Sequence, residues 1–144
     1  MNQELPDVEI FAVRDDFDRI ARRYIGAVVD NGGRVLLVRR RVDSELRPGC
    51  WEVPVARLAD NENLVQASDR GLAAGTCLQI EEITAYHGFV DFIDRGGVLA
   101  RLHLFAVSVT DVMRLRIGGD YEAHSWEPAE VIEEFISRYR QRPG

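Results

Sequence analysis

The feature that most constrains the fold is a pair of apolar runs joined by Asn31-Gly32-Gly33. The runs are YIGAVVD before the junction and RVLLVRR after it. Asn-Gly and Gly-Gly supply the positive φ angles that a tight hairpin turn requires. We therefore predict a β-hairpin over 24–41, followed by a polar loop over 43–49.

A helix is predicted next, over 63–76. Leu64, Ala67 and Leu72 lie on one face of this segment. Gly71 and Gly75 fall inside it, and each costs a helix about 1 kcal/mol relative to alanine. This helix must therefore be stabilised mainly by packing.

Two long strands and a final helix complete the chain. Alternation predicts strands over 83–93 and 98–109, with a turn at 94–97. Pro128 suits the first turn of the last helix, which carries an apolar stripe over 131–139. This order favours an α/β fold with helices on both sides of a mixed sheet. Before the hairpin, we expect residues 1–21 to form an arm or an edge strand around 11–13.

Composition fits one globular domain that is not built to bind nucleic acid. The chain has 144 residues, of which 46% are hydrophobic and 29% charged. A formal net charge of −6 argues against a nucleic-acid backbone as partner. No apolar run reaches membrane-spanning length, and the polar N-terminus does not resemble a targeting signal, so we expect a cytoplasmic protein. Cys50 and Cys77 lack metal-site spacing and are interpreted as reduced thiols.

The segment from Trp51 to Ile80 carries the only recognisable chemical motif. A Trp-x-x-Pro approach over 51–54 is followed by Glu62 and Arg70, and Glu122-x3-Trp126 comes later. In order and spacing these residues resemble the Nudix family, whose signature is G-x5-E-x7-R-E-U-x-E-E-x-G-U, with U aliphatic. The resemblance covers about 22–135. It implies a Nudix-type α/β/α sandwich, with a domain over 22–136 and the C-terminal helix end and tail over 137–144.

The same resemblance implies chemistry that this sequence has mostly lost. Nudix enzymes hydrolyse nucleoside diphosphate derivatives with Mg²⁺ or Mn²⁺ held by glutamates of the signature. Gly71, Ala74 and Gly75 stand at three of those acidic positions, and Cys77 replaces the closing glycine. Because Mg²⁺ prefers oxygen ligands, a helix face without carboxylates should bind it poorly. The retained residues are those of the scaffold, namely Pro54, Glu62, Arg70 and Leu72.

We therefore interpret the chain as a weak or inactive pyrophosphohydrolase that binds a nucleotide or another diphosphate. Glu122 is the candidate catalytic residue, and Glu62 with Glu122 is the candidate metal pair. If the protein is active, Mg²⁺ or Mn²⁺ is the expected cofactor; otherwise none is expected. The candidates for substrate binding are Arg39, Arg41, Trp51 and Trp126, since guanidinium groups suit phosphates and indoles can stack on a base.

Other interpretations remain open at this stage. An active hydrolase could use relocated ligands, drawn from Glu62, Glu122 and the Glu81-Glu82 pair, with Asp60 or Asp69 assisting. The LLVRRR…RPGCW stretch also resembles the isopentenyl diphosphate isomerase branch of the family. A protein-interaction domain without a ligand is a further alternative, and the sequence leaves a homodimer open.

Overall fold

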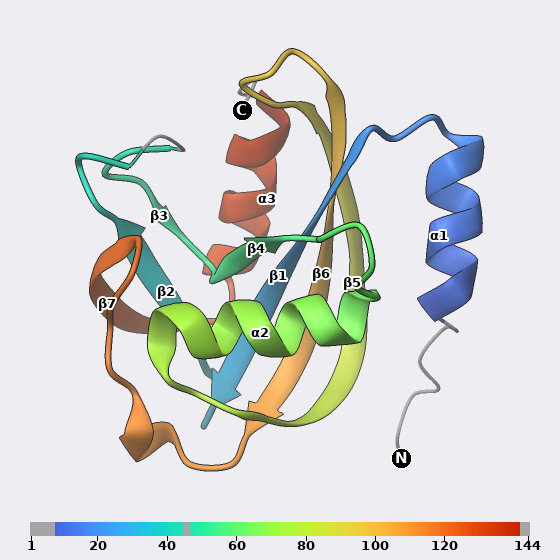
Figure 1. Ribbon diagram of the computed structural model, residues 1–144. Helices are drawn as coiled ribbons and strands as arrows, with labels where there is room; N and C mark the ends of the chain where they lie inside the picture. Colours follow the sequence, from blue (N-terminus) through green and yellow to red (C-terminus); the bar gives the residue numbers. More distant parts are fainter. Residues whose placement is uncertain (1–7, 45–46, 142–144) are drawn as a thin grey trace.

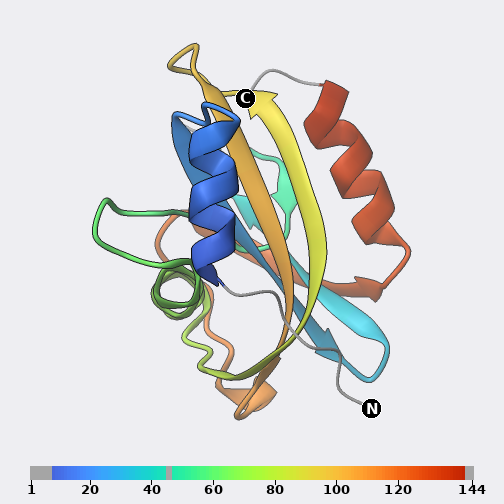
Figure 2. The ribbon, with the colours of Figure 1, turned by 90° about the vertical axis from the view of Figure 1, so that its right-hand side faces the viewer.

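The computed structural model describes residues 8–44 and 47–141 of the chain. The sheet has the order β3-β2-β1-β6-β5, with β4 added on β1 and β7 on β2. Figures 1 and 2 show α1 and α2 on one side of the sheet and α3 on the other. The elements in chain order are α1 (Val8–Phe17), β1 (Arg22–Asn31), β2 (Arg34–Arg40), β3 (Trp51–Glu52), β4 (Val55–Arg57), α2 (Leu64–Thr76), β5 (Ile80–Ile93), β6 (Leu99–Val109), the 3-10 turn η1 (Val112–Arg114), β7 (Tyr121–Pro128) and α3 (Val131–Gln141).

The hairpin at the start of the sheet is confirmed. β1 and β2 pair antiparallel, with Asn31 opposite Arg34. Gly32 and Gly33 have φ angles of 63° and 85°, in the region that favours glycine. The two residues between the strands thus supply the turn that the sequence predicts.

The mixed sheet is also confirmed. β1 runs parallel to β6 from Arg22 opposite Ala100 to Val29 opposite Val107. β5 pairs antiparallel with β6, so the two predicted long strands form one edge of the sheet. The last helix presents its predicted stripe to the sheet, with Phe135 1% exposed.

Two hydrophobic cores hold the helices against the sheet. The first lies under α1 and α2 and contains Phe11, Leu64 and Leu72. The second lies under α3 and contains Phe135 and Tyr139. The expected boundary between 136 and 137 therefore falls inside α3, because Tyr139 is part of the second core.

Two expectations about local structure were wrong, and one strand was not predicted. Residues 11–13 lie in α1 and not in an edge strand. Pro128 ends β7, and α3 begins three residues later. The strand β7 itself was not predicted, although it pairs with β2 along its length. Residues 1–7 of the expected arm lie outside the described residues.

A buried ionic cluster fixes α1 to the sheet. Asp15 is 1% exposed and accepts hydrogen bonds from Arg23 at 2.7 Å and Arg101 at 3.0 Å. The Asp15 carboxylate also lies 2.9 Å from His103 Nε2. Arg101 also donates to Asp91 and to Asp18. Each buried charge in this cluster therefore has an opposite charge beside it, as burial requires.

No helix within the described ranges is long and apolar enough to cross a membrane.

Candidate functional site

Helix α2 positions one wall of the candidate site. Asn63 caps its first turn by accepting a hydrogen bond from Gln66 N at 2.8 Å. The Gln66 side chain accepts one in return from Asn63 N at 2.9 Å, which completes a capping box. At the other end, Cys77 adopts a left-handed conformation with φ of 62° and closes the helix. Cys77 stands at the position of the motif's closing glycine, and it adopts the left-handed conformation that ends a helix.

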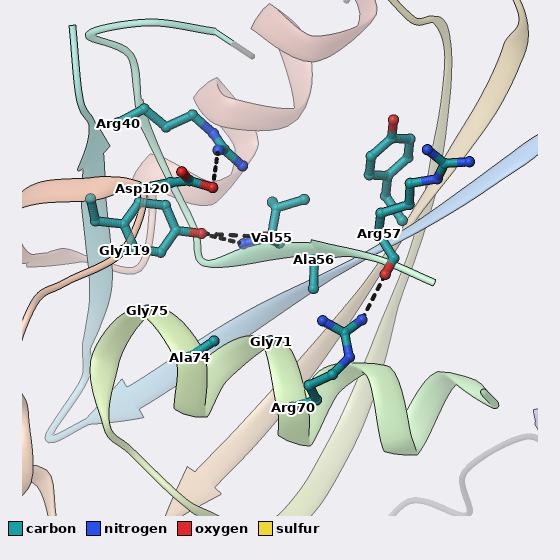
Figure 3. A pocket seen from close by; sticks show the side chains of 12 residues that line it. Arg40, Val55, Ala56, Arg57, Arg70, Gly71, Ala74, Gly75, Gly119 and Asp120 are labelled. Carbon is teal, nitrogen blue, oxygen red and sulfur yellow. Dashed lines mark hydrogen bonds and ion pairs between the residues drawn. The ribbon is translucent and has the colours of Figure 1, made fainter. Parts of the chain in front are cut away.

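A cavity of about 340 Å³ lies between α2, β4 and the start of β7 (Figure 3). Its volume is at the small end of the range for ligand sites. The lining residues are Tyr24, Arg40, Val55, Ala56, Arg57, Arg70, Gly71, Ala74, Gly75, Gly119, Asp120 and Tyr121.

Three small residues of α2 line this cavity. Gly71, Ala74 and Gly75 form the α2 wall in Figure 3. Their spacing of three and four residues gathers them on one helix face. At these three positions α2 therefore presents one methyl group and bare backbone to the cavity.

Gly71 permits close contact between α2 and β4. A Cβ atom added at position 71 would collide with the Cβ of Ala56. Ala56 is anchored on β4, which pairs with β1, and cannot move aside as a flexible side chain would. The small residues at positions 56 and 71 thus fit each other sterically.

Tyr121 fills the space beside Gly75. A Cβ atom at position 75 would lie 2.5 Å from the Tyr121 ring. The ring is fixed, because its hydroxyl accepts a hydrogen bond from Val55 N at 3.0 Å and lies 3.3 Å from Val55 O. Burial, together with the charge of Glu52, raises the pKa of Tyr121 to about 12, so the phenol stays neutral. Tyr121 thus occupies the place of a side chain at position 75.

Arg70 reaches the cavity from α2 and is held by two partners. Its Nε donates to Glu62 at 2.7 Å, and its Nη2 donates to Glu62 at 2.9 Å and to the Arg57 carbonyl at 2.8 Å. The hydrogen bond from Arg70 lowers the pKa of Glu62 to about 2, so the pair stays ionised over a wide range. Among the described residues, Nη1 of Arg70 has no hydrogen-bond partner and keeps its donors for a ligand.

Arg40 enters the cavity from β2. It is 6% exposed and donates through Nε to the fully buried Glu52 at 3.0 Å. Its Nη1 lies 3.7 Å from Asp120, which is exposed. Glu52 also has Arg47 beside it at 3.3 Å, so two guanidinium groups share one buried carboxylate.

Arg57 is the least restrained cation of the cavity. It ends β4, opposite Tyr24 of β1. In the part of the chain that the structure describes, its guanidinium has no ion pair or hydrogen bond. The cavity therefore holds three arginines, from β2, β4 and α2, against one carboxylate, Asp120.

This donor set does not fit Mg²⁺ or Mn²⁺. Within residues 8–44 and 47–141, no group of three or more His, Cys, Asp or Glu side chains could hold a metal ion. Glu62 is bound by Arg70, and Glu122 lies 3.4 Å from Arg39. A divalent cation at the α2 face would meet arginines where it needs carboxylate oxygens.

The predicted site residues are scattered around this cavity, and few of them line it. Arg39 stacks over Trp51, Arg41 pairs with Asp43, and Trp51 packs on the second core. Trp126 packs on the first core. None of these four side chains lines the cavity. Arg40, which stands between Arg39 and Arg41 in the sequence, is the one that lines the cavity.

The scaffold residues occupy structural positions. Pro54 and Leu72 are buried, and the Pro54 carbonyl accepts a hydrogen bond from Ala27 N at 2.9 Å. Sequence reasoning missed Arg57, Asp120 and Tyr121. Arg57 lies between Pro54 and Glu62 of the motif, and Tyr121 precedes Glu122, but no pattern in the sequence shows that both line the cavity beside α2.

Comparison with known proteins agrees with this architecture. The MutT protein from Methanosarcina mazei Go1 matches with a TM-score of 0.69 and 19% identity, over 83% of this chain and 93% of that one. A MutT Nudix hydrolase from Burkholderia pseudomallei matches with a TM-score of 0.65 and 23% identity, over 76% of this chain and 84% of that one. The chain has the Nudix fold.

An Ap4A hydrolase from C. elegans, solved as a binary complex, shares the same Nudix fold. Its TM-score is 0.65 at 15% identity, over 84% of this chain and 89% of that one. No family model matches the sequence, and no curated protein matches it. At these identities the structural similarity establishes the fold, and activity must be argued from the cavity itself.

Proposed function

We propose that this protein binds a diphosphate-containing ligand, such as a nucleotide, in the α2–β4 cavity without a divalent metal ion and without hydrolysing it. One observation supports this most strongly. The α2 face of the cavity lacks carboxylates, while Arg40, Arg57 and Arg70 border it. Guanidinium groups pair with phosphate oxygens through two parallel hydrogen bonds, so arginine takes over the neutralising role of a metal.

Arg57 and Arg70 are the groups best placed to contact the phosphates. Arg57 keeps all its donors, and Arg70 is oriented by Glu62 so that Nη1 stays available. Arg40 is more deeply buried and already neutralised by Glu52. Because Arg47 also pairs with Glu52, these three groups together leave a net positive charge beside the cavity, which Asp120 partly offsets.

The absence of turnover follows from the same geometry. Hydrolysis of a diphosphate needs an activated water molecule as well as charge neutralisation. Arginine supplies no general base, and Glu122 is engaged with Arg39 away from the cavity lining. The site therefore stabilises the bound anion without a group that would activate water.

Calorimetric titration tests this proposal. The full chain is titrated with ADP, UDP and inorganic pyrophosphate, once with EDTA and once with Mg²⁺. We expect binding of similar affinity in both buffers. Arg57→Gln should weaken it about tenfold, since a charge-assisted hydrogen bond contributes about 1.5–3 kcal/mol. Arg114→Gln is the matched control, because Arg114 is exposed and lies outside the cavity.

A phosphate-release assay on the same compounds with Mg²⁺ and Mn²⁺ completes the test. We expect no turnover. Metal-dependent turnover that disappears in Glu122→Gln would overturn the proposal and show a site rebuilt around Glu122. Turnover equal in both proteins would indicate a contaminating enzyme.

A further inference from the structure

The charged side chains of the α2–β4 cavity lie at its two ends. In Figure 3, Arg57 and Arg70 stand at one end, where Arg70 Nη2 donates to the Arg57 carbonyl at 2.8 Å. Arg40 and Asp120 stand at the other end, 3.7 Å apart. The wall between the ends, which we call the middle of the cavity, consists of Val55, Ala56, Gly71, Ala74 and Gly75. None of these five residues has a polar side chain.

The two tyrosines of the cavity use their hydroxyl protons within the protein. Tyr121 donates to the Val55 carbonyl at 3.3 Å and accepts from Val55 N at 3.0 Å, so it also satisfies both polar backbone groups of Val55. Tyr24 donates to Asp94 at 3.4 Å. In the part of the chain that the structure describes, the middle and the two phenols beside it thus offer no free side-chain donor.

We infer that the middle of the cavity binds an aromatic ring attached to the phosphate that Arg57 and Arg70 hold. The ligand is then an aryl or arylmethyl phosphate, in which no sugar separates the ring from the phosphate. This inference rests on the proposed function and names the chemical class of the group beside the phosphate.

The lack of donors in the middle selects against a sugar. A ribose or hexose placed there would turn its hydroxyl groups toward Ala56 and Ala74 and would lose their hydrogen bonds to water without replacement, which costs free energy. A carbon ring has no such groups and gains free energy when its apolar surface leaves water. A nucleotide therefore binds through its phosphates alone, with its sugar outside the middle.

The shape of α2 and the charge of Arg57 favour an aromatic ring over an aliphatic group. Ala74 is exposed, and Gly71 and Gly75 on either side of it have no side chains that would hold a flat group away from its methyl. A guanidinium also attracts the face of an aromatic ring, as Arg40 does over Tyr121 at 5.5 Å from the ring centroid. Arg57 can donate to a phosphate in its plane and stack a ring on its face.

Three phosphate monoesters test the inference by calorimetry of the full chain in EDTA, beside inorganic pyrophosphate. The esters are methyl, cyclohexyl and phenyl phosphate, at about pH 8, where all three are dianions. We expect phenyl phosphate to bind about tenfold more tightly than methyl phosphate, because only the ring differs. Cyclohexyl phosphate should bind clearly more weakly than phenyl phosphate, because it lacks the attraction of an aromatic face for a guanidinium.

The variant Ala74→Asn places a polar side chain in the middle of the cavity. It should remove the preference for phenyl phosphate and leave the affinity for methyl phosphate unchanged. Ala73→Asn is the matched control, because Ala73 is exposed on the same helix and does not line the cavity. Arg57→Gln should weaken all three esters, because the phosphate contact is common to them.

NMR of the alanine methyl groups locates the ring directly. Phenyl phosphate should shift the Ala74 methyl resonance through the ring current, and methyl phosphate should not. The Ala74→Asn spectrum assigns that resonance by its loss. The Ala73 methyl should keep its position with both ligands.

The outcomes separate the inference from the proposed function. Equal affinity for phenyl and methyl phosphate overturns the aromatic site, while metal-free binding of pyrophosphate keeps the proposed function. Cyclohexyl phosphate binding as tightly as phenyl phosphate overturns the aromatic class, and so does a phenyl preference that persists in Ala74→Asn. Absence of binding by pyrophosphate and by all three esters overturns the inference and the proposed function together.

Discussion

Two arginine-rich regions of this molecule differ in how completely their charges are neutralised. Under α1, Asp15 sits among Arg23, Arg101 and His103, and Arg101 has two further carboxylates, so the positive charges there have partners within the protein. In the α2–β4 cavity, Arg57 has no such partner among the described residues. The first arrangement holds a helix in place, and the second leaves charge available for a ligand.

The comparison shows why the number of arginines alone says little about function. All 18 basic residues of the chain are arginine, so clusters arise in both regions. A guanidinium bound to buried carboxylates gains nothing further from a phosphate, because its donors are already used. We therefore expect an arginine to bind a ligand only where some of its donors are not used by partners within the protein.

The largest expected effect is on the region under α1. Asp15→Ala removes the central carboxylate and leaves buried charges without a counterion, which should lower the free energy of unfolding by about 3 kcal/mol. Urea denaturation measures this, with the exposed Asp16→Ala as control on the same helix. UDP affinity of the folded variant should stay unchanged. A stability loss no larger than that of Asp16→Ala would contradict a structural role for this cluster.

The same region should also set the response to acid. Burial alone would raise the pKa of Asp15, but its bonds to His103, Arg101 and Arg23 hold that pKa below the usual 3.8. A depressed carboxyl pKa contributes stability above the unfolded value that is lost as pH falls through the folded one. Wild-type stability should therefore fall below about pH 4, and Asp15→Ala should show a smaller fall, measured by thermal unfolding from pH 6 to pH 2.

The next largest effect concerns the steric fit between α2 and β4. Gly71→Ala places a Cβ against Ala56, and such overpacking should cost about 2 kcal/mol in spite of the better helix propensity of alanine. Adding Ala56→Gly removes the clash and should recover at least half of the loss. A double-mutant cycle of unfolding free energies measures this coupling. Additive effects would show that the two residues do not constrain each other.

A smaller effect is expected at Arg57. In contrast to Asp15→Ala, a change of Arg57 should lower ligand affinity and leave stability nearly unchanged. Arg57→Gln should weaken UDP binding about tenfold, or about 1.4 kcal/mol. Because Arg57 is exposed and its guanidinium has no partner among the described residues, the unfolding free energy should change by less than about 0.5 kcal/mol. Calorimetry and urea denaturation of the same sample measure both. Loss of stability without loss of affinity would show that Arg57 has a structural role and not a binding role.

The smallest effect is expected at the Glu62–Arg70 pair. The hydrogen bond from Arg70 lowers the pKa of Glu62 from 4.5 to about 2. Its contribution to stability is present above pH 4.5 and is lost as pH falls toward 2. A carboxyl NMR titration should place the Glu62 midpoint near pH 2 in the wild type and clearly higher in Arg70→Gln. An unchanged midpoint in Arg70→Gln would show that the pair is not formed in solution.

Local signals in the sequence predicted most of the fold. The hairpin was predictable because Asn31-Gly32-Gly33 favours the positive φ angles that its turn requires. The α3 stripe could be read because its apolar residues follow helical spacing. Helix α1 was missed, since Phe11 is buried while Val13 and Phe17 are exposed, which leaves no single apolar face. Strand β7 was missed because its burial depends on pairing with β2, which is a tertiary feature.

The site was predictable only in part for the same reason. Motif spacing located Gly71, Ala74 and Gly75, and the structure places all three on the cavity wall. Spacing could not show that Tyr121 fills the space beside Gly75, since these residues meet only in the folded chain. Nor could it distinguish Arg57 from Arg39, because that difference lies in which arginine has a carboxylate partner.

The central claim is that arginine has replaced the divalent metal in this cleft. Calorimetric titration of the full chain with UDP, in EDTA and then in Mg²⁺, tests it most directly. The account predicts equal affinity in the two buffers and about tenfold weaker binding in Arg57→Gln. Binding that requires Mg²⁺ and is unaffected by Arg57→Gln would contradict it.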